Sequence, residues 1–376
     1  MLHMTHQLIL STGLFTLAFS ISALTIPLLK RVAWSLNIVD HPGERKIHTV
    51  ATPLLGGIAV LLGFYGTILL ALVFVQSDAF YPLFYQRVPD LIADLAYLDT
   101  IKVKLLAFAL GGLLIASVGL LDDKYGPNFS FHIKLLVQLA VALGLVCAGI
   151  RTTIFPGELL DYLISTLWLV GITNSFNLLD NMDGLTSGVA ITSGILFLFV
   201  ALIQGQWFIA LTLVTFLGAI SAFLCFNFPP ASIFLGDAGS LFIGYTLAAL
   251  SLLESFITQP THSVAPVVIP LLIMGLPIFD TFSVIVIRLK QGRPIYKGDK
   301  SHLSHRLISL GLAPRRTLLV ICLIALAMGL EAPLIPRMGI TGIVLLVAHA
   351  AIISLIVTIL MILGERRRTP PSSPKP

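Results

Sequence analysis

The segment from Asn174 to Gly184 gathers polar side chains between two apolar runs. It reads Asn-Ser-Phe-Asn-Leu-Leu-Asp-Asn-Met-Asp-Gly, with Asn174, Asn177, Asp180 and Asp183 at intervals of three residues. Residues three apart lie near one face of a helix. Amides and carboxylates at the end of an apolar helix are costly unless they contact water, a partner or a ligand. This segment is therefore the first candidate for a binding or catalytic site.

Two further acidic clusters carry groups suited to phosphate and metal chemistry. Asp122 and Asp123 are adjacent, and Lys134 follows in the next apolar run, where its ammonium is placed to hold a phosphate near them. Asp237 stands in Gly-Asp-Ala-Gly-Ser, where small neighbours allow a backbone to approach a metal-bound phosphate closely. Mg²⁺ is usually bound by one or two carboxylates together with phosphate and water, so Asp237 is a candidate ligand.

Two basic segments add groups that bind anions. The first contains His302, His305 and Arg306 close to several lysines. Arginine and lysine clamp phosphate, and a neutral histidine donates a hydrogen bond without a full charge. The second contains Lys46, which lies ten residues before the paired glycines Gly56 and Gly57 at the start of an apolar run.

Each cluster also has a purely structural interpretation. The adjacent aspartates can be a charged helix end, the glycines around Asp237 can serve helix packing, and the basic segments can be topology signals. Asp280 lies inside a later apolar run, where it is either a functional group or the partner of a basic residue on another span.

Composition assigns the chain to the integral membrane proteins. Of its 376 residues, 57% are hydrophobic and only 11% are charged, and the mean hydropathy is +0.98. This is too little polar surface to cover a water-soluble globule of this size. The three cysteines lie in apolar runs without metal-ligand spacing, which argues against both a disulfide and a zinc site.

Runs of about 20 apolar residues mark transmembrane helices. Eleven are predicted, at about 7–29, 53–76, 103–121, 132–150, 161–179, 184–203, 206–226, 233–254, 264–288, 317–335 and 339–363.

The distribution of lysine and arginine orients these spans. Most of these residues fall in the loops that share a side with the C-terminus, which predicts a cytoplasmic C-terminus and an N-terminus outside. This use of the basic residues accounts for the net charge of +5 without a nucleic acid partner. The acidic and histidine clusters all fall on the predicted cytoplasmic side, although they played no part in setting the topology. The sequence thus predicts an all-α polytopic membrane protein with one domain over residues 1–364, its active site on the cytoplasmic face, and a basic, proline-rich disordered tail over residues 365–376.

Five motifs in this order resemble the polyprenyl-phosphate N-acetylhexosamine-1-phosphate transferases, which form glycosyltransferase family 4. The motifs are Pro53-Leu-Leu-Gly-Gly57, Leu121-Asp-Asp-Lys-Tyr-Gly126 with Lys134, Asn174 to Gly184, Phe234-Leu-Gly-Asp-Ala-Gly-Ser240 and His302-Leu-Ser-His-Arg306. The resemblance runs from about residue 45 to residue 306. It implies a multi-pass enzyme of the bacterial cytoplasmic (inner) membrane. The reaction that the resemblance implies is attack by undecaprenyl phosphate on the β-phosphate of a UDP-N-acetylhexosamine, with release of UMP. The implied cofactor is Mg²⁺, with Mn²⁺ as an alternative.

The resemblance also implies roles for individual residues. Asp122 or Asp123 would deprotonate or orient the lipid phosphate, Asp237 would hold Mg²⁺, and the Asn177 to Asp183 motif would help to hold metal and nucleotide. The expected catalytic residues are Asp122, Asp123, Asp180 and Asp183; the expected substrate-binding residues are Lys46, Lys134, Asn174, Asn177, His302, His305 and Arg306; and the expected metal ligands are Asp237 and Asp183.

One departure from the family pattern bears on the substrate. Family members often carry His-x-His-His where this chain has Ser304 at the middle position. The segment resembles the branch that starts cell-envelope polysaccharides with N-acetylglucosamine-1-phosphate more than the branch that transfers phospho-N-acetylmuramoyl-pentapeptide in peptidoglycan synthesis.

Two other classes of protein compete with this interpretation. An intramembrane prenyltransferase also binds a diphosphate through Mg²⁺, but its acids are typically four residues apart, whereas here they are adjacent or three apart. An anion transporter would usually have its site near the bilayer midplane between repeated halves. The donor sugar, the acceptor chain length, the base among Asp122 and Asp123, and the presence of a homodimer stay open at this stage.

Overall fold

The computed structural model describes residues 2–42, 50–76, 98–254, 265–294 and 301–368. The predicted substrate-binding residue Lys46 and residues 369–376 of the predicted tail lie outside the described residues. The helices and strands are α1 (Leu2–Ser35), β1 (Val39–Asp40), β2 (Thr52–Pro53), α2 (Gly56–Gln76), α5 (Leu98–Tyr125), η1 (Gly126–Asn128), α6 (Phe131–Cys147), α7 (Glu158–Leu179), α8 (Leu185–Ile203), α9 (Trp207–Asn227), α10 (Gly236–Leu253), α11 (Ala265–Ile273), α12 (Gly275–Lys290), α13 (Leu303–Ser309), α14 (Pro314–Gly329), η2 (Ala332–Arg337) and α15 (Ile340–Arg368).

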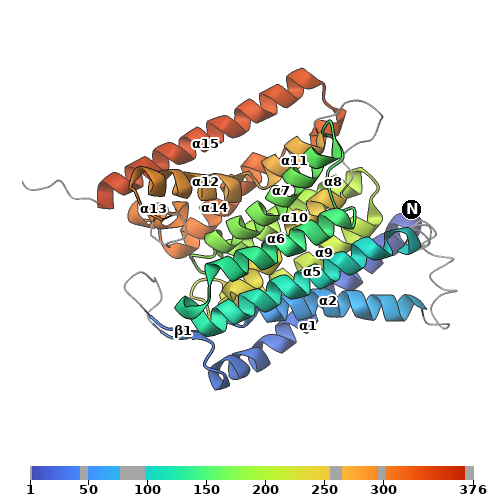
Figure 1. Cartoon of the computed structure of the whole chain (residues 1–376), viewed down its shortest axis with the longest axis horizontal. Coiled ribbons are helices and arrows are strands. Elements are labelled where there is room, and N and C mark those ends of the chain that lie inside the picture. The colour runs from blue at the N-terminus through green and yellow to red at the C-terminus, as the bar shows by residue number, and fades with distance from the viewer. Residues whose placement is uncertain (1, 43–49, 77–97, 255–264, 295–300, 369–376) are drawn as a thin grey trace, which may run out of the picture.

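The described residues form a bundle of long apolar helices, which confirms the predicted all-α polytopic membrane class (Figure 1). Within them, nine helices are long and apolar enough to span a bilayer, and α11 with α12 forms a further, bent candidate. The predicted span at 132–150 corresponds to α6, which is apolar but has only 17 residues. The total of eleven spans and the orientation of the termini stay predictions.

The bend between α11 and α12 has a local cause. The two helix axes differ by 73°. Pro277 has no backbone N–H and so cannot donate to the carbonyl of Ile273, four residues earlier. That carbonyl accepts a hydrogen bond of 3.3 Å from the hydroxyl of Ser193 on α8 instead. A side chain of a neighbouring helix thus satisfies the backbone group that the proline leaves free, as the apolar environment requires.

Helix α10 is the most buried of the described spanning helices, and it packs against α2, α5, α7 and α8. Small residues allow this close packing. A Cβ atom added at Gly57 of α2 would lie 2.2 Å from the backbone of Gly239 of α10, and one added at Gly119 of α5 would lie 2.5 Å from the backbone of Ala238. Helices α1 and α15 are the least buried and lie at opposite edges of the bundle (Figure 1).

A short antiparallel hairpin joins the N-terminal part of the chain to the start of α10. Strand β1 pairs with β2, and the segment after β2 continues the pairing with residues 234 and 235. Phe234 N donates to Pro53 O at 2.8 Å, Gly56 N donates to Phe234 O at 2.9 Å, and Gly57 N donates to Leu235 O at 2.8 Å. Two motifs almost 180 residues apart in the sequence are thus held together by backbone hydrogen bonds, next to Asp237.

Helix α15 extends through Arg368 and so includes the first four residues of the predicted tail. Glu365 and the three arginines that follow are good helix formers, whereas Pro370 and Pro371 lie just beyond.

The replacement Gly57→Ala is expected to lower the melting temperature of the detergent-solubilised protein. The added Cβ would overlap the backbone of Gly239, so α2 and α10 would have to move apart, and overpacking of this kind costs about 1–3 kcal/mol. Gly144→Ala in α6 is the matched control, because a Cβ there meets no atom within 4 Å. The control should melt at the wild-type temperature or slightly above it. Equal melting temperatures for the two variants would contradict the close approach of α2 and α10.

Candidate active site

A cavity of about 1300 Å³ opens at the end of the bundle where β1 and α13 lie (Figure 1). Its walls come from the hairpin, the C-terminal end of α5, the turn between α7 and α8, the connection between α9 and α10, and the start of α14. A second cavity, of about 700 Å³, lies along α1 and is lined by apolar, glycine and hydroxyl residues without an ionisable group. The ionisable residues that line the larger cavity are Asp40, His41, Asp122, Asp123, Lys124, Tyr125, Asp180, Asp183, Asp237, His305 and Arg315.

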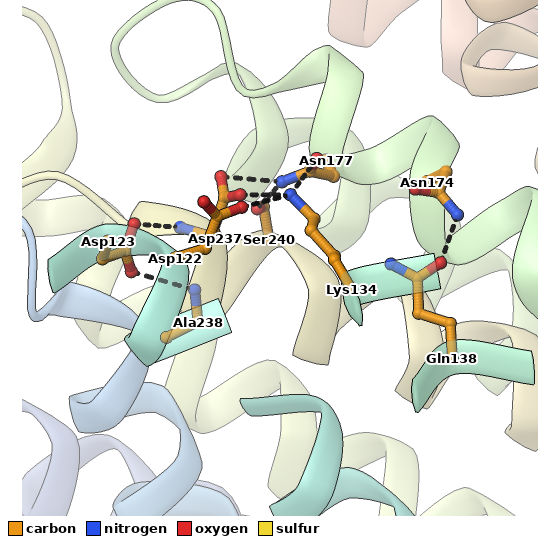
Figure 2. A network of polar contacts seen from close by, with 9 residues as sticks. All are labelled: Asp122, Asp123, Lys134, Gln138, Asn174, Asn177, Asp237, Ala238 and Ser240. Atoms are coloured by element: carbon orange, nitrogen blue, oxygen red, sulfur yellow. Dashed lines mark hydrogen bonds and ion pairs between the residues drawn. The ribbon is translucent and has the colours of Figure 1, made fainter. Parts of the chain in front are cut away.

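A lysine and two aspartates from three helices meet beside this cavity (Figure 2). The two aspartates line it, whereas Lys134 and Asn177, both expected to bind substrate, lie behind them and are not among its lining residues. The ammonium of Lys134 on α6 lies 2.9 Å from Asp122 Oδ2 on α5 and contacts Asp237 Oδ2 on α10. Asn177 of α7 accepts from the same ammonium at 3.2 Å, and its amide nitrogen donates to Asp237 Oδ1 and to Ser240 Oγ, both at 2.9 Å. The positive charge compensates the two carboxylates, which would otherwise repel each other where water is scarce.

Asp123 has a different role from its neighbour Asp122. Its two oxygens accept from the backbone N–H groups of Asp237, at 2.7 Å, and Ala238, at 3.0 Å (Figure 2). Asp237 and Ala238 are the second and third residues of α10 and belong to its first turn, whose N–H groups have no partner within the helix. A carboxylate at a helix N-terminus is also favoured by the helix dipole. Gly236 precedes them with a φ of +73°, and a Cβ there would lie 2.5 Å from Asp123 Oδ2. Asp122 therefore faces a cation, whereas Asp123 holds the backbone of α10.

The turn between α7 and α8 is tied to the connection between α9 and α10. Asp183 Oδ2 accepts from Ala231 N at 2.9 Å, and Gly184 N donates to Asn227 Oδ1 at 2.8 Å. Gly184 has a φ of +75°, a conformation that glycine adopts without strain. In the sequence, Gly184 offers the chain a place to leave the preceding helix, but α7 already ends at Leu179, and Gly184 instead lies just before the first residue of α8. Both expected metal ligands, Asp183 and Asp237, line the cavity, but one oxygen of Asp183 is already engaged by the backbone.

Asp180 also lines the cavity and is close enough to Asp237 and Asp183 to be affected by their charges. Burial raises the pKa of Asp180 to about 7, and the negative charges of Asp237 and Asp183 add to the rise. A carboxyl group with this pKa changes its charge near neutral pH, and a nearby cation would favour its ionised form.

Asn174 lies outside the cavity wall, although it was predicted to bind substrate. Its amide nitrogen donates to Gln138 Oε1 on α6 (Figure 2). The same nitrogen also donates to Val170 O, at 2.9 Å. An α-helix turns about 100° per residue, so each step of three residues rotates the side chain by about 60° from the previous one. Asn177 therefore points toward Asp237, whereas Asn174 joins α7 to α6.

His302 is buried beside the intramembrane acid Asp280. Its Nδ1 lies 2.7 Å from Asp280 Oδ2, and Asp280 Oδ1 accepts from Leu303 N at 2.8 Å. Only 4% of His302 and 1% of Asp280 are exposed. Asp280 thus pairs with a histidine rather than with a lysine or arginine, and it caps the first turn of α13.

Of the three expected anion-binding residues on this segment, His305 alone lines the cavity in the described part of the chain. Arg306 is 3% exposed; its Nε donates to Ser301 O at 2.8 Å and its Nη1 to Met361 O at 3.1 Å. These bonds hold α13 against α15. Ser304, at the position where relatives often have histidine, donates to Asn181 Oδ1 in the turn between α7 and α8.

Comparison with known proteins identifies the family. Residues 105–255 match glycosyl transferase family 4. The chain is 34% identical over 328 residues, 84% of its length and 83% of the relative, to the probable undecaprenyl-phosphate N-acetylglucosaminyl 1-phosphate transferase of Bacillus subtilis. The chain belongs to glycosyl transferase family 4. It is also 30% identical to the decaprenyl-phosphate N-acetylglucosaminephosphotransferase of Mycobacterium tuberculosis, over 78% of this chain and 75% of the relative. Identity to the undecaprenyl-phosphate alpha-N-acetylglucosaminyl 1-phosphate transferase of Escherichia coli is 26%, over 85% of this chain and 82% of the relative.

The matched region of this family 4 protein coincides with the centre of the site. It begins within α5, after the first seven of its 28 residues, and continues through α10. This part of the chain supplies the Lys134 ion pairs and the turn between α7 and α8. The resemblance stated from the five motifs is thus confirmed. Helix α13, which carries His305, lies outside the matched region and reaches the cavity through its packing against α14 and α15.

The polar residues of the family 4 cavity that are absent from the expected site residues are Asn37, Asp40, His41, Thr52, Lys124, Tyr125, Asn181, Asn227 and Arg315. Asn227, which bridges Gly184 and Ile233, ends an apolar helix just before two prolines, and an amide at that place was a usable signal. Arg315 was interpreted only as a topology signal, and no local pattern distinguishes it from the adjacent Arg316.

The replacement Asp180→Asn is expected to flatten the pH dependence of thermal stability. The pKa of Asp180 is about 7 in the folded protein and 3.8 for an ordinary aspartate, so between these values the folded state binds the extra proton. The contribution of this group to stability therefore falls as the pH rises from about 4 to 7. Melting temperatures at about pH 5 and pH 8, without divalent cations, measure the effect. The wild type should lose more stability than the variant on going to the higher pH, and an equal loss would contradict the raised pKa.

Proposed function

We propose that this protein transfers N-acetylglucosamine-1-phosphate from UDP-N-acetylglucosamine to undecaprenyl phosphate on the cytoplasmic face of the bacterial inner membrane. UMP is released, and a lipid-linked diphosphate sugar is formed that starts a cell-envelope polysaccharide. The observation that carries the proposal is the convergence of Asp122, Lys134, Asn177 and Asp237 beside a cavity at the end of spanning helices. A lipid phosphate held in the bilayer can reach such a site with its head group.

The relatives support the classes of donor and acceptor. Their names combine N-acetylglucosamine phosphate transfer with undecaprenyl phosphate in two cases and with decaprenyl phosphate in the third. The greater identity to the Bacillus subtilis protein favours undecaprenyl phosphate. These names also favour N-acetylglucosamine over the pentapeptide substrate, and a transferase over a prenyltransferase or an anion transporter.

The reaction needs positioning and charge neutralisation more than covalent participation of the protein. An oxygen of the lipid phosphate attacks the β-phosphorus of the donor, and the bond from that phosphorus to the oxygen of the departing UMP breaks. Asp122 is the better candidate to orient the lipid phosphate or accept its proton, because both oxygens of Asp123 are engaged by the backbone of α10. Lys134 and Asn177 hold Asp237 in place.

The residues present fit Mg²⁺ as the cofactor, with Mn²⁺ as an alternative. Asp237, Asp122 and Asp183 offer carboxylate oxygens at one cavity, and magnesium commonly takes one or two carboxylates together with substrate phosphates and water. Within the described residues no group of three or more His, Cys, Asp or Glu side chains is arranged to hold a metal. We therefore expect the ion to depend on the donor diphosphate for part of its coordination. When bound, it would neutralise the phosphate oxygens and polarise the β-phosphate.

The replacement Asp237→Asn is expected to reduce UMP release by roughly a hundredfold to a thousandfold, the usual effect of removing one group that stabilises developing charge. The assay uses detergent-purified protein, undecaprenyl phosphate and Mg²⁺, with UDP-N-acetylglucosamine, UDP-N-acetylgalactosamine and UDP-N-acetylmuramoyl-pentapeptide in separate reactions. Glu158→Gln is the control and should leave the rate unchanged, because it removes an exposed carboxylate at the first residue of α7, which pairs with Arg151 in the segment before that helix.

The outcomes separate the parts of the proposal. Release of UMP from UDP-N-acetylglucosamine alone, abolished by omitting the lipid phosphate or by chelating the metal, supports all of them. Release from a different donor would correct the sugar. Turnover by Asp237→Asn at the wild-type rate would remove Asp237 from the site.

A further inference from the structure

The cavity has many acids and few cations for a site that is proposed to bind two phosphate compounds. In the described part of the chain, its walls carry six aspartates but only two lysine or arginine side chains, Lys124 and Arg315. The other basic groups near it are occupied, because Lys134 bridges two carboxylates and Arg306 donates to backbone carbonyls. In the described part of the chain, the candidate cations for a phosphate at this wall are therefore Lys124 and Arg315, and neither is among the substrate-binding residues expected from the sequence.

Arg315 is held so that part of its guanidinium stays available. It is the second residue of α14, and its Nε donates to Pro229 O at 2.7 Å. Its Cζ lies 5.7 Å from the ring centroid of Phe228, a distance at which a cation is attracted to an aromatic face. These two contacts fix the direction of the side chain at the cavity wall. A guanidinium has five N–H donors, and the two terminal nitrogens present a planar pair that matches a phosphate oxyanion.

The neighbours of Arg315 place it beside the turn between α7 and α8. Arg315 binds the carbonyl of Pro229, and Asp183 binds the N–H of Ala231, two residues further along the same connection. Arg315 and Asp183 thus hold one short segment at both of its ends, and both line the cavity. Asp183 belongs to the motif that the family resemblance expects to help to hold the nucleotide. Arg315 therefore lies next to the part of the cavity where the nucleotide is expected to bind.

We propose that Arg315 binds a phosphate group of the donor sugar nucleotide, and that Arg306 serves only to hold α13 in place. This inference rests on the proposed function for the identity of the donor. It separates two arginines that sequence inspection ranks in the opposite order, because Arg306 belongs to a family motif and Arg315 does not.

The test compares Arg315→Ala and Arg315→Lys with Arg316→Ala as the matched control. Arg316 is the adjacent exposed arginine and does not line the cavity. Hydrogen bonds to charged groups are among the stronger ones, so Arg315→Ala should raise KM for UDP-N-acetylglucosamine roughly tenfold to a hundredfold. KM for undecaprenyl phosphate should stay unchanged, and so should both constants in the control. Arg315→Lys should fall between, because lysine keeps the charge but not the paired donors.

Inhibition by UDP and by uridine distinguishes phosphate binding from a structural role. Uridine has the base and ribose of UDP but no phosphate. The inhibition constant of UDP should rise by the same factor as KM in Arg315→Ala, while that of uridine should not change. An equal loss for both inhibitors would mean that Arg315 only supports the segment at Pro229, and unchanged UDP inhibition would remove it from the donor site. A rise confined to KM for the lipid phosphate would overturn the assignment to the donor.

The proposed function and this inference fail in different ways. If the wild type releases no UMP, the proposed function is wrong. If the wild type is active and Arg315→Ala binds UDP normally, only the inference is wrong. Should Arg315→Ala not fold, Arg315→Lys decides the question, because a lysine that leaves UDP inhibition unchanged would overturn the need for a paired donor there.

Discussion

The Lys134 ammonium, held between the carboxylates of Asp122 and Asp237, is the interaction on which the site depends. It joins the end of α5, the start of α6 and the start of α10 at one point. Two carboxylates this close would repel each other strongly near a bilayer, and removing one partner of such a buried group leaves an uncompensated charge. Because Asp122 and Asp237 also line the cavity, the contact that fixes three helices relative to one another presents two acids to a substrate.

The start of α10 owes its position to the backbone as much as to charges. Asp123 accepts from the N–H groups of the second and third residues of α10, and the segment around the end of β2 pairs with the two residues before the helix. Glycines on α2, α5 and α10 permit backbone contact around it. Asp237 therefore stands on a rigid support, and rigid support is what a reaction governed by positioning requires. The packing of small residues and the chemistry of the site serve the same geometry.

Some basic residues of this family 4 protein stabilise the packing of its helices, and others line the cavity. Whether a basic residue belongs to a motif does not predict which of the two roles it has. Arg306 is buried against backbone carbonyls and His302 against Asp280, whereas Arg315 and His305 face the cavity. A buried guanidinium that satisfies carbonyl groups stabilises the packing of α13 on α15. That packing sets the position of His305. The histidine motif thus contributes the side chain of His305 to the cavity, whereas His302 and Arg306 hold the helix that carries it in position.

The amino-acid sequence alone determined the membrane class, the approximate spans and the family, because apolar run length and short motifs are local properties that survive in any arrangement of the helices. It also placed on one side of the membrane five aspartates that line one cavity in the structure: Asp122, Asp123, Asp180, Asp183 and Asp237. Only the tertiary structure decided that Asp122 rather than Asp123 faces Lys134, that Asn177 rather than Asn174 reaches Asp237, and that Arg315 rather than Arg306 lines the cavity. The physical reason is the helical rotation of about 100° per residue: which side chain faces a site depends on the rotation of each helix, and packing against distant neighbours sets that rotation.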